Sequence, residues 1–457
     1  MTTFHNAWLE EQDYRIRLKE ISWEGYQRAS LLSVDDLTLL QAVSGTQKIK
    51  RESVWEGNPE TYMGLYLRLL SSLTRTDCLQ VILVHIGDFL NEHEERSDLL
   101  RKLNPSDSTT SYLSISKHKD SSDIYIRIKS ITILGSLIGA DPSPPSQASR
   151  AILPGIDQLV QSNDLNEQEI GIQCLDHVLR QPSIRQTLWQ SENPSESSKD
   201  KSNPTPSNSR SAQSGLLSSL TKLVKVGSKL NAQMQYQVGF CFWLLSFDDE
   251  IARNLNKKYN VLPSLIELTR VAVKEKVIRV LVATFRNLVT KASEANIGPM
   301  LVTGSLPLIQ NLASRKWSDE ELKEDLQWLK EQLQEAKARM TTYDEYSTEL
   351  ESGLLHWSPP HTSDEFWTEN ADKLNGKDYQ QLKTLIRLLS ESEDPIVLAV
   401  AANDLSKYVK YCDTGKMIAQ RLGAKSSVMN LMNHSNPDVK YWALVSVQQL
   451  ISQPWVL

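Results

Sequence analysis

Two segments near the C-terminus repeat one pattern, and this repeat limits the possible folds more than any other feature of the chain. The first is DPIVLAVAANDLSKYV from Asp394, and the second is NPDVKYWALVSVQQLI from Asn436. Their prolines lie 42 positions apart, at Pro395 and Pro437, and the first turn of a helix tolerates proline. After each proline, apolar or small residues recur at steps of four, four and three, which puts them on one helical face. The two stripes are Val397, Ala401, Leu405 and Tyr408, and Val439, Ala443, Val447 and Leu450.

The same stripe recurs upstream at intervals of about 40 to 47 residues once inserts are set aside, which is the period of HEAT and armadillo arrays. Any amphipathic helix offers one such stripe, so it is the regular spacing that supports a repeat. Glycine and proline number only 18 each, which also suits a helical chain. We therefore predict an all-α, armadillo- or HEAT-like superhelix. The upstream stripes are Leu79, Leu83, Gly87 and Leu90; Ile126, Ser130, Leu134 and Leu137; Ile170, Cys174 and Val178; Met234, Val238, Phe242 and Leu245; and Val277, Leu281, Phe285 and Leu288.

Two stretches interrupt the repeats and predict the domain organisation. Residues 191–214 hold nine serines and three prolines but no large apolar side chain, so they cannot offset their ordering entropy and are predicted to be a disordered insert. After Met340 the apolar pattern stops in a polar segment, which predicts a hinge at residues 341–353. The chain then divides into an N-terminal array at residues 1–340 and a C-terminal repeat domain at residues 354–457.

A heptad pattern marks one long helix that starts near Ser318. Ser318 and Glu321 predict a capping box at its beginning. Three heptads are short for a free coiled coil, so we expect this helix to close the end of the array, with an intermolecular zipper as the alternative. The heptad positions are Leu322, Leu326, Leu329, Leu333, Ala336 and Met340.

Charge and composition exclude several classes of function. The net charge is −6, and nucleic acid is not an expected partner, because phosphate binding requires clustered Lys and Arg. No stretch reaches the roughly 20 apolar residues that span a bilayer, and the first residues lack the apolar core of a signal peptide. The four cysteines lie far apart without a CxxC pair, which predicts reduced, buried thiols of a cytosolic protein.

The sequence carries no catalytic motif. It lacks the phosphate-binding GxxxxGK[ST] pattern, and GxGxxG, HExxH and GxSxG are also absent. The eight histidines have no cysteine or paired carboxylate at ligand spacing, so we predict a structural or surface role for each, with no cofactor and no metal. Helical-repeat arrays usually hold other proteins on their long surfaces. The residues alone therefore predict a non-catalytic interaction protein.

One segment resembles a known family. DEYSTELESGLLHWSPPHTSDEFWTENADKLN, from Asp344 to Asn375, resembles the junction segment of the H subunit of the eukaryotic vacuolar-type proton ATPase (V-ATPase). SRKWSDEELKEDLQWLKEQL from Ser314 and GKMIAQRLGAKSSVMNLMNH from Gly415 are similar to the same family. The resemblance covers roughly residues 306–455. Its distinctive elements are Asp344-Glu345-Tyr346, Glu349-Leu350, Ser352-Gly353, Trp357-Ser358-Pro359, His361 and Phe366-Trp367.

The resemblance implies two all-α arrays joined by a linker, in a non-catalytic regulatory subunit of the pump. Such a subunit binds the E and G subunits of the stator stalk and the cytosolic N-terminal region of the a subunit in the membrane sector. It supports coupled ATP hydrolysis and proton transport. When the sectors separate, it contacts catalytic or rotor subunits and inhibits hydrolysis by the released sector. It would be cytoplasmic, on the cytosolic face of vacuolar or endomembrane membranes, without inserting into them.

The candidate partner contacts come from two places. One set matches the family motif, although packing of the first C-terminal helix is the preferred role for its last two members: Trp357, Pro359, His361, Phe366 and Trp367. The other lies at the end of a repeat helix: Asp404, Lys407, Lys410 and Tyr411. The alternative function is an importin-like armadillo cargo adaptor or another scaffold. The regularly repeated Trp and Asn pairs of that adaptor family are missing.

Overall fold

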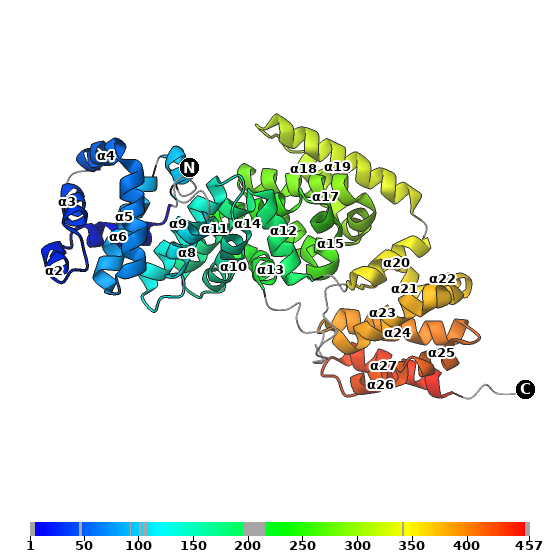
Figure 1. The fold of residues 1–457 in the computed structure, drawn as a ribbon. Helices are drawn as coiled ribbons and strands as arrows, with labels where there is room; N and C mark the ends of the chain where they lie inside the picture. Colours follow the sequence, from blue (N-terminus) through cyan, green and yellow to red (C-terminus); the bar gives the residue numbers. More distant parts are fainter. Residues whose placement is uncertain are drawn as a thin grey trace, which may run out of the picture. The chain divides into compact units, whose positions relative to one another are not determined.

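The computed structural model describes residues 5–44, 48–91, 93–99, 103, 108–194, 215–340 and 342–452. Every regular element in these ranges is a helix, which confirms the all-α prediction (Figure 1). The chain forms two compact units, Met1–Ala252 with Val271–Asn287, and Arg253–Arg270 with Leu288–Leu457. Residues 288–340, which the sequence assigned to the N-terminal array, therefore share a unit with the C-terminal repeats.

The first unit holds the helices that precede α15. They are α1 (Ala7–Arg17), α2 (Trp23–Arg28), α3 (Val34–Val43), α4 (Lys48–Gly57), α5 (Pro59–Ser72), α6 (Thr76–Leu90), η1 (Glu94–Asp98), α8 (Ser108–Ser116), α9 (Ile124–Ala140), α10 (Ser146–Val160), α11 (Leu165–Leu179), α12 (Pro182–Glu192), α13 (Leu216–Lys225), η4 (Gly227–Lys229) and α14 (Ala232–Leu245).

Three helices run from one unit into the other: α15 (Asp249–Tyr259), α16 (Val261–Val271) and α17 (Glu275–Val302). The helices that follow belong to the second unit. They are α18 (Ser305–Ala313), α19 (Glu320–Arg339), α20 (Thr342–Ser352), α21 (Pro359–Thr362), α22 (Asp364–Asn370), η5 (Ala371–Asn375), α23 (Gly376–Glu391), α24 (Pro395–Tyr411), α25 (Gly415–Arg421), α26 (Ala424–Leu431) and α27 (Pro437–Ile451).

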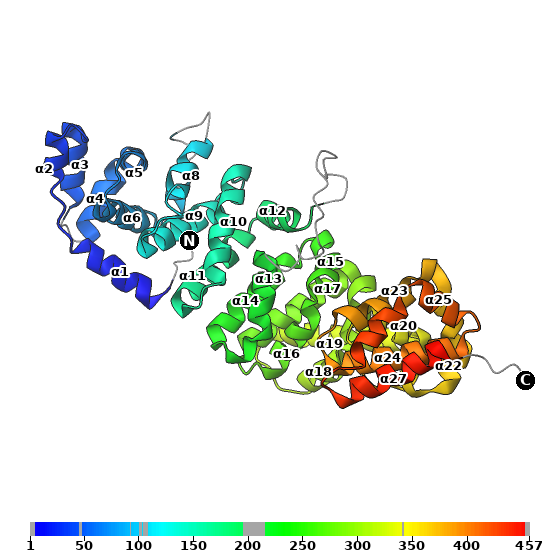
Figure 2. The ribbon, with the colours of Figure 1, turned by 90° about the horizontal axis from the view of Figure 1, so that it is seen from below.

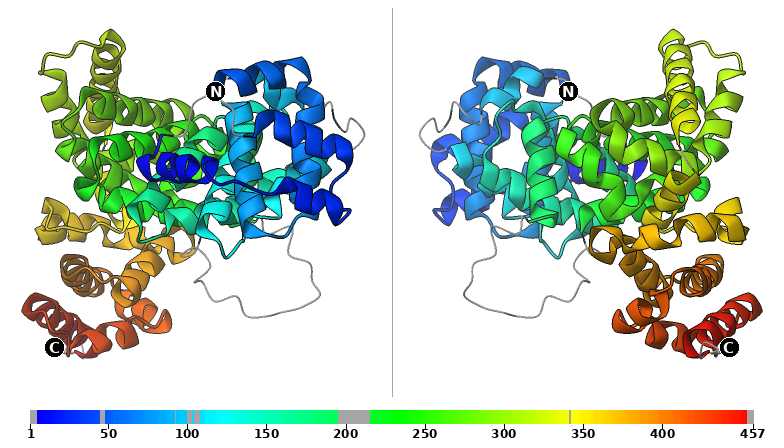
Figure 3. Two further views of the ribbon diagram at one scale, coloured as in Figure 1. Left: turned by 90° about the vertical axis from the view of Figure 1, so that its left-hand side faces the viewer. Right: turned by 90° about the vertical axis from the view of Figure 1, so that its right-hand side faces the viewer.

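The stripes predicted from the repeat face the interior. All eight members of the two C-terminal stripes are buried, and so are the large apolar members of the upstream stripes. Asp394 caps α24 by accepting the Ile396 N–H at 2.8 Å, and Asn436 caps α27 by accepting the Asp438 N–H at 2.9 Å. These two helices lie side by side (Figure 1 and Figure 3). The helical repeat is confirmed.

In the first unit, α6, α9, α11 and α14 pack in succession, and α1 crosses three of them (Figure 2). The apolar side chains Leu9 and Ile16 of α1 are buried. Its polar contacts go to the three stacked helices: Asn6 to Glu169 of α11 at 2.9 Å, Asp13 to Lys129 of α9 at 2.6 Å, and Arg17 to Asp88 of α6. The repeat pattern did not predict this cross-brace, because α1 lies outside the period.

The long heptad helix is α19, and its N-cap differs from the prediction. Asp319 accepts the Leu322 N–H at 2.9 Å, so the N-cap is Asp319 and not the predicted Ser318. A carboxylate directly before the first turn satisfies a free N–H and meets the positive end of the helix dipole. The leucine seam is buried within the chain, where α18 is its neighbour. The seam therefore serves the unit itself and not an intermolecular zipper.

The segment predicted to be a hinge contains the helix α20 over residues 342–352. Tyr346 and Leu350 of α20 are fully buried in the C-terminal core. With Glu349 they follow the i, i+3, i+4 spacing of one helical face, while most of the other residues of α20 are polar and at least partly exposed. The polar composition therefore reflects an exposed helix face. Thr341 lies outside the described residues.

Helix α20 also approaches α17 closely. A Cβ atom at Gly298 of α17 would lie 2.7 Å from Cγ2 of Thr348 in α20. A side chain at residue 298 would therefore require the Thr348 side chain or one of the two helices to shift. This close approach is one reason why the end of α17 shares a compact unit with the C-terminal repeats.

The four cysteines are buried free thiols, as predicted. Of the predicted disordered insert at residues 191–214, residues 195–214 lie outside the described residues, while Ser191 and Glu192 form the end of α12. Within the described ranges, no helix has both the length and the apolar character needed to cross a bilayer.

The place of α20 in the core can be tested by Leu350→Ala. We expect this change to lower the free energy of unfolding of the C-terminal repeats by about 2–5 kcal/mol, because it leaves a cavity in a packed interior. Urea unfolding followed by tryptophan fluorescence measures the loss. The control is Glu351→Ala on the exposed side of α20, where we expect a change within about 0.5 kcal/mol. Equal stability of the two variants would mean that α20 is a loose linker.

Candidate functional site

A buried group of charges joins three helices of the C-terminal core. His361 of α21 is fully buried, and its Nδ1 lies 2.7 Å from Oδ2 of Asp404 in α24. Its Nε2 lies 3.2 Å from Oε1 of Glu349 in α20, an ion-pair distance at an angle outside regular hydrogen-bond geometry. Glu349 also accepts the His356 N–H at 2.8 Å and the Ser358 hydroxyl at 2.9 Å. We call the first three residues the Glu349–His361–Asp404 network.

The charges of this network shift the pKa values of its three side chains. Burial alone would lower the pKa of His361, but the charges of Asp404 and Glu349 outweigh it and raise that pKa to about 10. Burial also opposes ionisation of Glu349, yet its contacts with His361, His356 and Ser358 hold its pKa below the ordinary value. Burial dominates at Asp404 and raises its pKa. An imidazolium between two carboxylates therefore joins α20, α21 and α24.

The burial of these residues corrects part of the predicted contact surface. His361, Asp404, Phe366 and Trp367 are interior residues, so their side chains are not open to a partner in this structure. The expected packing role of Phe366 and Trp367 is confirmed, since the ring centroids of both lie within 5.4 Å of that of Tyr346. The motif residues His361, Phe366 and Trp367 therefore belong to the buried core of the C-terminal repeats.

Three of the predicted contacts form an exposed charged group beside Asp364 of α22. Lys407 pairs with Asp364, and Lys410 lies 3.6 Å from the same carboxylate and donates to the Tyr411 hydroxyl at 2.8 Å. The hydrogen bonds from Lys407 and Tyr411 lower the pKa of Asp364 to about 2. Exposed ion pairs of this kind contribute little to stability, so a partner could rearrange them at small cost.

Aromatic side chains form a second exposed group. Trp357, which is 42% exposed, has its ring centroid 5.3 Å from that of Trp442 in α27. Trp442 in turn lies 5.0 Å from Tyr441, whose side chain is 58% exposed. Pro359 is also exposed. Trp357 and Pro359 are thus the two members of the motif set that remain open to a partner. Aromatic residues of this kind often dominate the energy of protein interfaces.

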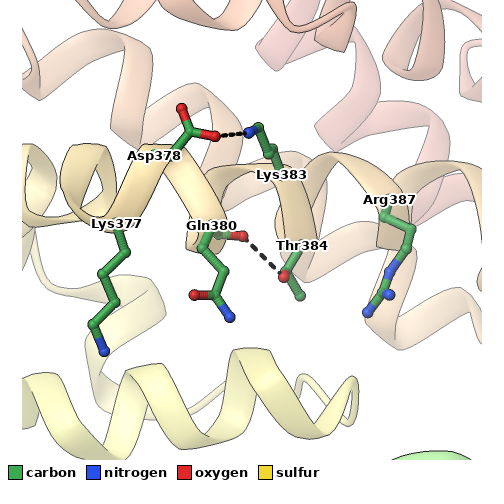
Figure 4. A pocket seen from close by; sticks show the side chains of 6 residues that line it. All are labelled: Lys377, Asp378, Gln380, Lys383, Thr384 and Arg387. Atoms are coloured by element: carbon green, nitrogen blue, oxygen red, sulfur yellow. Dashed lines mark hydrogen bonds and ion pairs between the residues drawn. The ribbon is translucent and has the colours of Figure 1, made fainter. Parts of the chain in front are cut away.

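A basic pocket on α23 was not predicted from the sequence. It has a volume of about 430 Å³, and Figure 4 shows Lys377, Gln380 and Arg387 extending from one side of the helix. Lys383 pairs with Asp378 at 2.6 Å on the other side. These cations offer sites for carboxylates or phosphates. The spacing of Lys377, Gln380, Thr384 and Arg387 on one helical face was the signal that could have revealed it.

The start of α23 is also strained. Lys377, Asp378 and Tyr379 have φ angles of 48°, 54° and 60°, in the left-handed region that costs a non-glycine residue roughly 1–2 kcal/mol. Arg421 lies over the Tyr379 ring at 5.1 Å and helps to hold this turn.

Within the described residues, no group of His, Cys, Asp and Glu is placed to hold a metal ion. The surfaces described above are suited to binding proteins.

The Glu349–His361–Asp404 network predicts a specific dependence of stability on pH. His361 has a raised pKa, so its contribution is complete below its ordinary value of about 6.5 and is lost as the pH rises toward 10. We therefore expect the C-terminal repeats to lose stability between pH 6.5 and about 10. In His361→Gln this slope should disappear, with a loss of about 3–5 kcal/mol at neutral pH, because two buried carboxylates lose their counter-ion.

Urea unfolding at several pH values measures both effects, and hydrogen exchange of α20, α21 and α24 locates them. The matched control is His356→Gln, since His356 Nδ1 lies 2.8 Å from the same Glu349 but its side chain is 57% exposed. We expect a change of about 0–1 kcal/mol there. A pH slope that survives in His361→Gln would contradict the charged state assigned to His361.

Comparison with known proteins agrees with these observations. Two family models of the V-ATPase H subunit match the chain, one over residues 7–333 and the other over residues 339–455. The H subunit of the V-type proton ATPase of Drosophila melanogaster is 31% identical over 455 residues, which cover 98% of this chain and 90% of that protein. A probable H subunit of the same pump in Caenorhabditis elegans, the one numbered 2, is 27% identical over 458 residues, covering 98% of this chain and 91% of that protein.

A probable V-type proton ATPase H subunit of Oryza sativa subsp. japonica is 27% identical over 455 residues, with 94% of each chain covered. The matches extend along nearly the whole chain, including the residues before 306 that lie outside the resemblance described above. They decide against the importin-like alternative. Because both family models match and one relative exceeds 30% identity, the chain belongs to the H-subunit family of the V-ATPase.

Proposed function

We propose that this chain is a non-catalytic regulatory subunit of the vacuolar-type proton-pumping ATPase. It links the soluble catalytic sector to the membrane sector, supports coupled ATP hydrolysis and proton transport, and inhibits hydrolysis by the released catalytic sector. The observation that carries this proposal is membership of the V-ATPase H-subunit family along nearly the whole chain. The helical-repeat fold supports it, because stacked helices supply long surfaces for protein partners.

The proposed partners follow from the same membership. The N-terminal array, residues 1–340, binds the E and G subunits of the stator stalk. The C-terminal repeats bind the cytosolic N-terminal region of the membrane-sector a subunit in the assembled pump, and catalytic or rotor subunits when the sectors are separated. The chain then lies peripherally on the cytosolic face of vacuolar or endomembrane membranes and is held there by proteins.

Inhibition in this proposal is mechanical. A subunit that binds the stator with one array and the rotor side with the other prevents rotation, and no chemistry of its own is required. Such a switch needs contacts of different strength in its two states, since flexibility alone shifts no equilibrium. The exposed charged group near Asp364 and the basic pocket of α23 are the surfaces that could supply contacts to acidic partners.

The packing of α20 supports one position for the proposed pivot. Because α20 packs into the C-terminal core through Tyr346 and Leu350, it moves with the C-terminal repeats. The pivot is then limited to the junction around Met340, between the end of α19 and the start of α20. A swing of the C-terminal repeats away from α17 would also separate Thr348 from Gly298.

Truncation after Met340 tests the division of labour. The fragment of residues 1–340 retains the whole of α19 and removes every residue of the C-terminal core. We expect this fragment to bind the purified catalytic sector but to leave its ATP hydrolysis uninhibited, because the second contact is missing. Sedimentation measures binding, and a coupled ATPase assay measures inhibition, with the full chain as the control. Full inhibition by the fragment would rule out the two-contact mechanism.

A further inference from the structure

The first unit contains a pocket of its own, with a volume of about 610 Å³. Its lining comes from the end of α1, the segment that follows it, the start of α2, the end of α3, and from α4 and α6. Helix α1 packs on α6, and α3 packs on both α2 and α4 (Figure 2). Pockets that bind small molecules usually measure about 300–1,000 Å³, so this one is large enough for such a ligand.

Apolar side chains form much of the wall of this pocket. Ile16 of α1, Trp23 of α2, Val43 of α3 and Val84 of α6 line it, and each is less than 5% exposed. Leu18 also lines the pocket and is 66% exposed, so the pocket opens to solvent beside it. Walls of this kind suit a ligand with an apolar body.

One buried polar atom of the lining has no hydrogen-bond partner among the described residues. His85 of α6 is 8% exposed, its ring centroid lies 5.8 Å from that of Tyr66, and its Nδ1 makes no hydrogen bond. Burial lowers the pKa of His85 to about 4, and the nearby charges of Arg51 and Arg17 add to this effect, so the ring is neutral at pH 7. The large majority of buried polar side-chain atoms have a partner, so this Nδ1 is a group that a ligand can complement.

Cations line the same pocket. Arg17 of α1 donates from Nε and Nη2 to Asp88, which uses two of the five N–H groups of its guanidinium. Arg51 of α4 lies 3.2 Å from the same carboxylate. Lys19 donates to the neutral amide oxygen of Gln80 at 2.7 Å. Guanidinium and ammonium groups beside a neutral imidazole favour a carboxylate as the polar end of a ligand.

The carboxylates of the lining lie on its exposed side. Glu20 and Glu24 are both exposed, and Glu24 accepts a hydrogen bond from Gln41 at 2.7 Å. The side chain of Arg51, in contrast, is only 13% exposed. Positive charge therefore lies deeper in the lining than negative charge, which favours an anion that enters the pocket.

We propose that this pocket binds a small amphiphilic carboxylate. Its apolar body lies against Trp23 and Val84. Its carboxylate accepts hydrogen bonds from Arg17 and Lys19 and, in the tautomer that carries the proton on Nδ1, from His85. The site belongs to the first unit alone, and the proposal does not rest on the role of the chain in the pump.

Isothermal titration calorimetry of the full chain with octanoate tests this proposal. Octylamine, a cation of the same chain length, is the charge control. We expect octanoate to bind with a Kd below about 1 mM and octylamine to bind at least tenfold more weakly, because its ammonium group would face Arg17 and Lys19. Equal affinity for the two probes overturns the proposal, and so does the absence of octanoate binding.

Two variants test the residues assigned to the carboxylate. Lys19→Glu changes an exposed residue, and we expect it to weaken octanoate binding at least tenfold. His85→Phe keeps an aromatic ring beside Tyr66 and removes Nδ1, so we expect a loss of about fivefold to tenfold. The matched control is Lys222→Glu, the same change at an exposed residue of α13 outside the lining, which should bind octanoate as the wild type does.

Circular dichroism checks the fold of each variant. If His85→Phe does not fold, Lys19→Glu decides alone, and an unchanged affinity in that variant overturns the proposal. Hydrogen exchange locates the ligand: octanoate should slow exchange at residues 16–24 and 81–85 and leave α13 unchanged. Protection confined to the second unit would place octanoate elsewhere and would also overturn the proposal.

Discussion

Each helix of a stacked array has two opposite faces to cover, and this requirement governs the whole C-terminal unit. Helix α24 meets it fully, because its residues from Val397 to Ser406 are all buried and it packs against α27, α23 and α25. Small residues such as Ala399 and Ala402 let neighbouring helices approach closely. Helix α27 is buried along one stripe, while Tyr441, Leu444 and Ile451 outside that stripe are exposed. This difference marks α24 as an interior helix of the array and α27 as the last helix of the described residues.

The parts of the fold that follow from local periodicity could be predicted from the sequence. The stripes that begin at Val397 and Val439 are buried, and their helices begin at the predicted prolines, because apolar spacing and first-turn chemistry act within one helix. Helix α20 could not be predicted in this way. Its buried face includes Glu349, and a carboxylate in a polar segment is taken as exposed unless its buried partner is known.

The same limit explains the errors at the candidate site. His361 and Asp404 lie 43 positions apart in the sequence, so only the fold reveals that each provides the charge the other needs in the interior. The resemblance marked His361 correctly as a distinctive residue but gave no sign of its burial. Trp357 and Pro359, in the same motif, remained on the surface. The motif therefore marked the segment that packs α20 and α21 against α24. Only the structure showed which residues of the motif are buried and which are exposed.

The short segment from Glu349 to Trp367 contributes side chains both to the buried core and to the exposed surface. In the proposed function the C-terminal repeats change partners, and a contact made on them can act on the junction near Met340 only through a body that does not deform. The Glu349–His361–Asp404 network joins α20 to α24, and α24 packs against α27, so α20 and α27 belong to one packed core. A variant that lacks the His361 imidazolium would weaken the connection between α20 and α24 and would change no exposed residue. Such a variant therefore changes the rigidity of the C-terminal repeats and leaves their surface chemistry as it is.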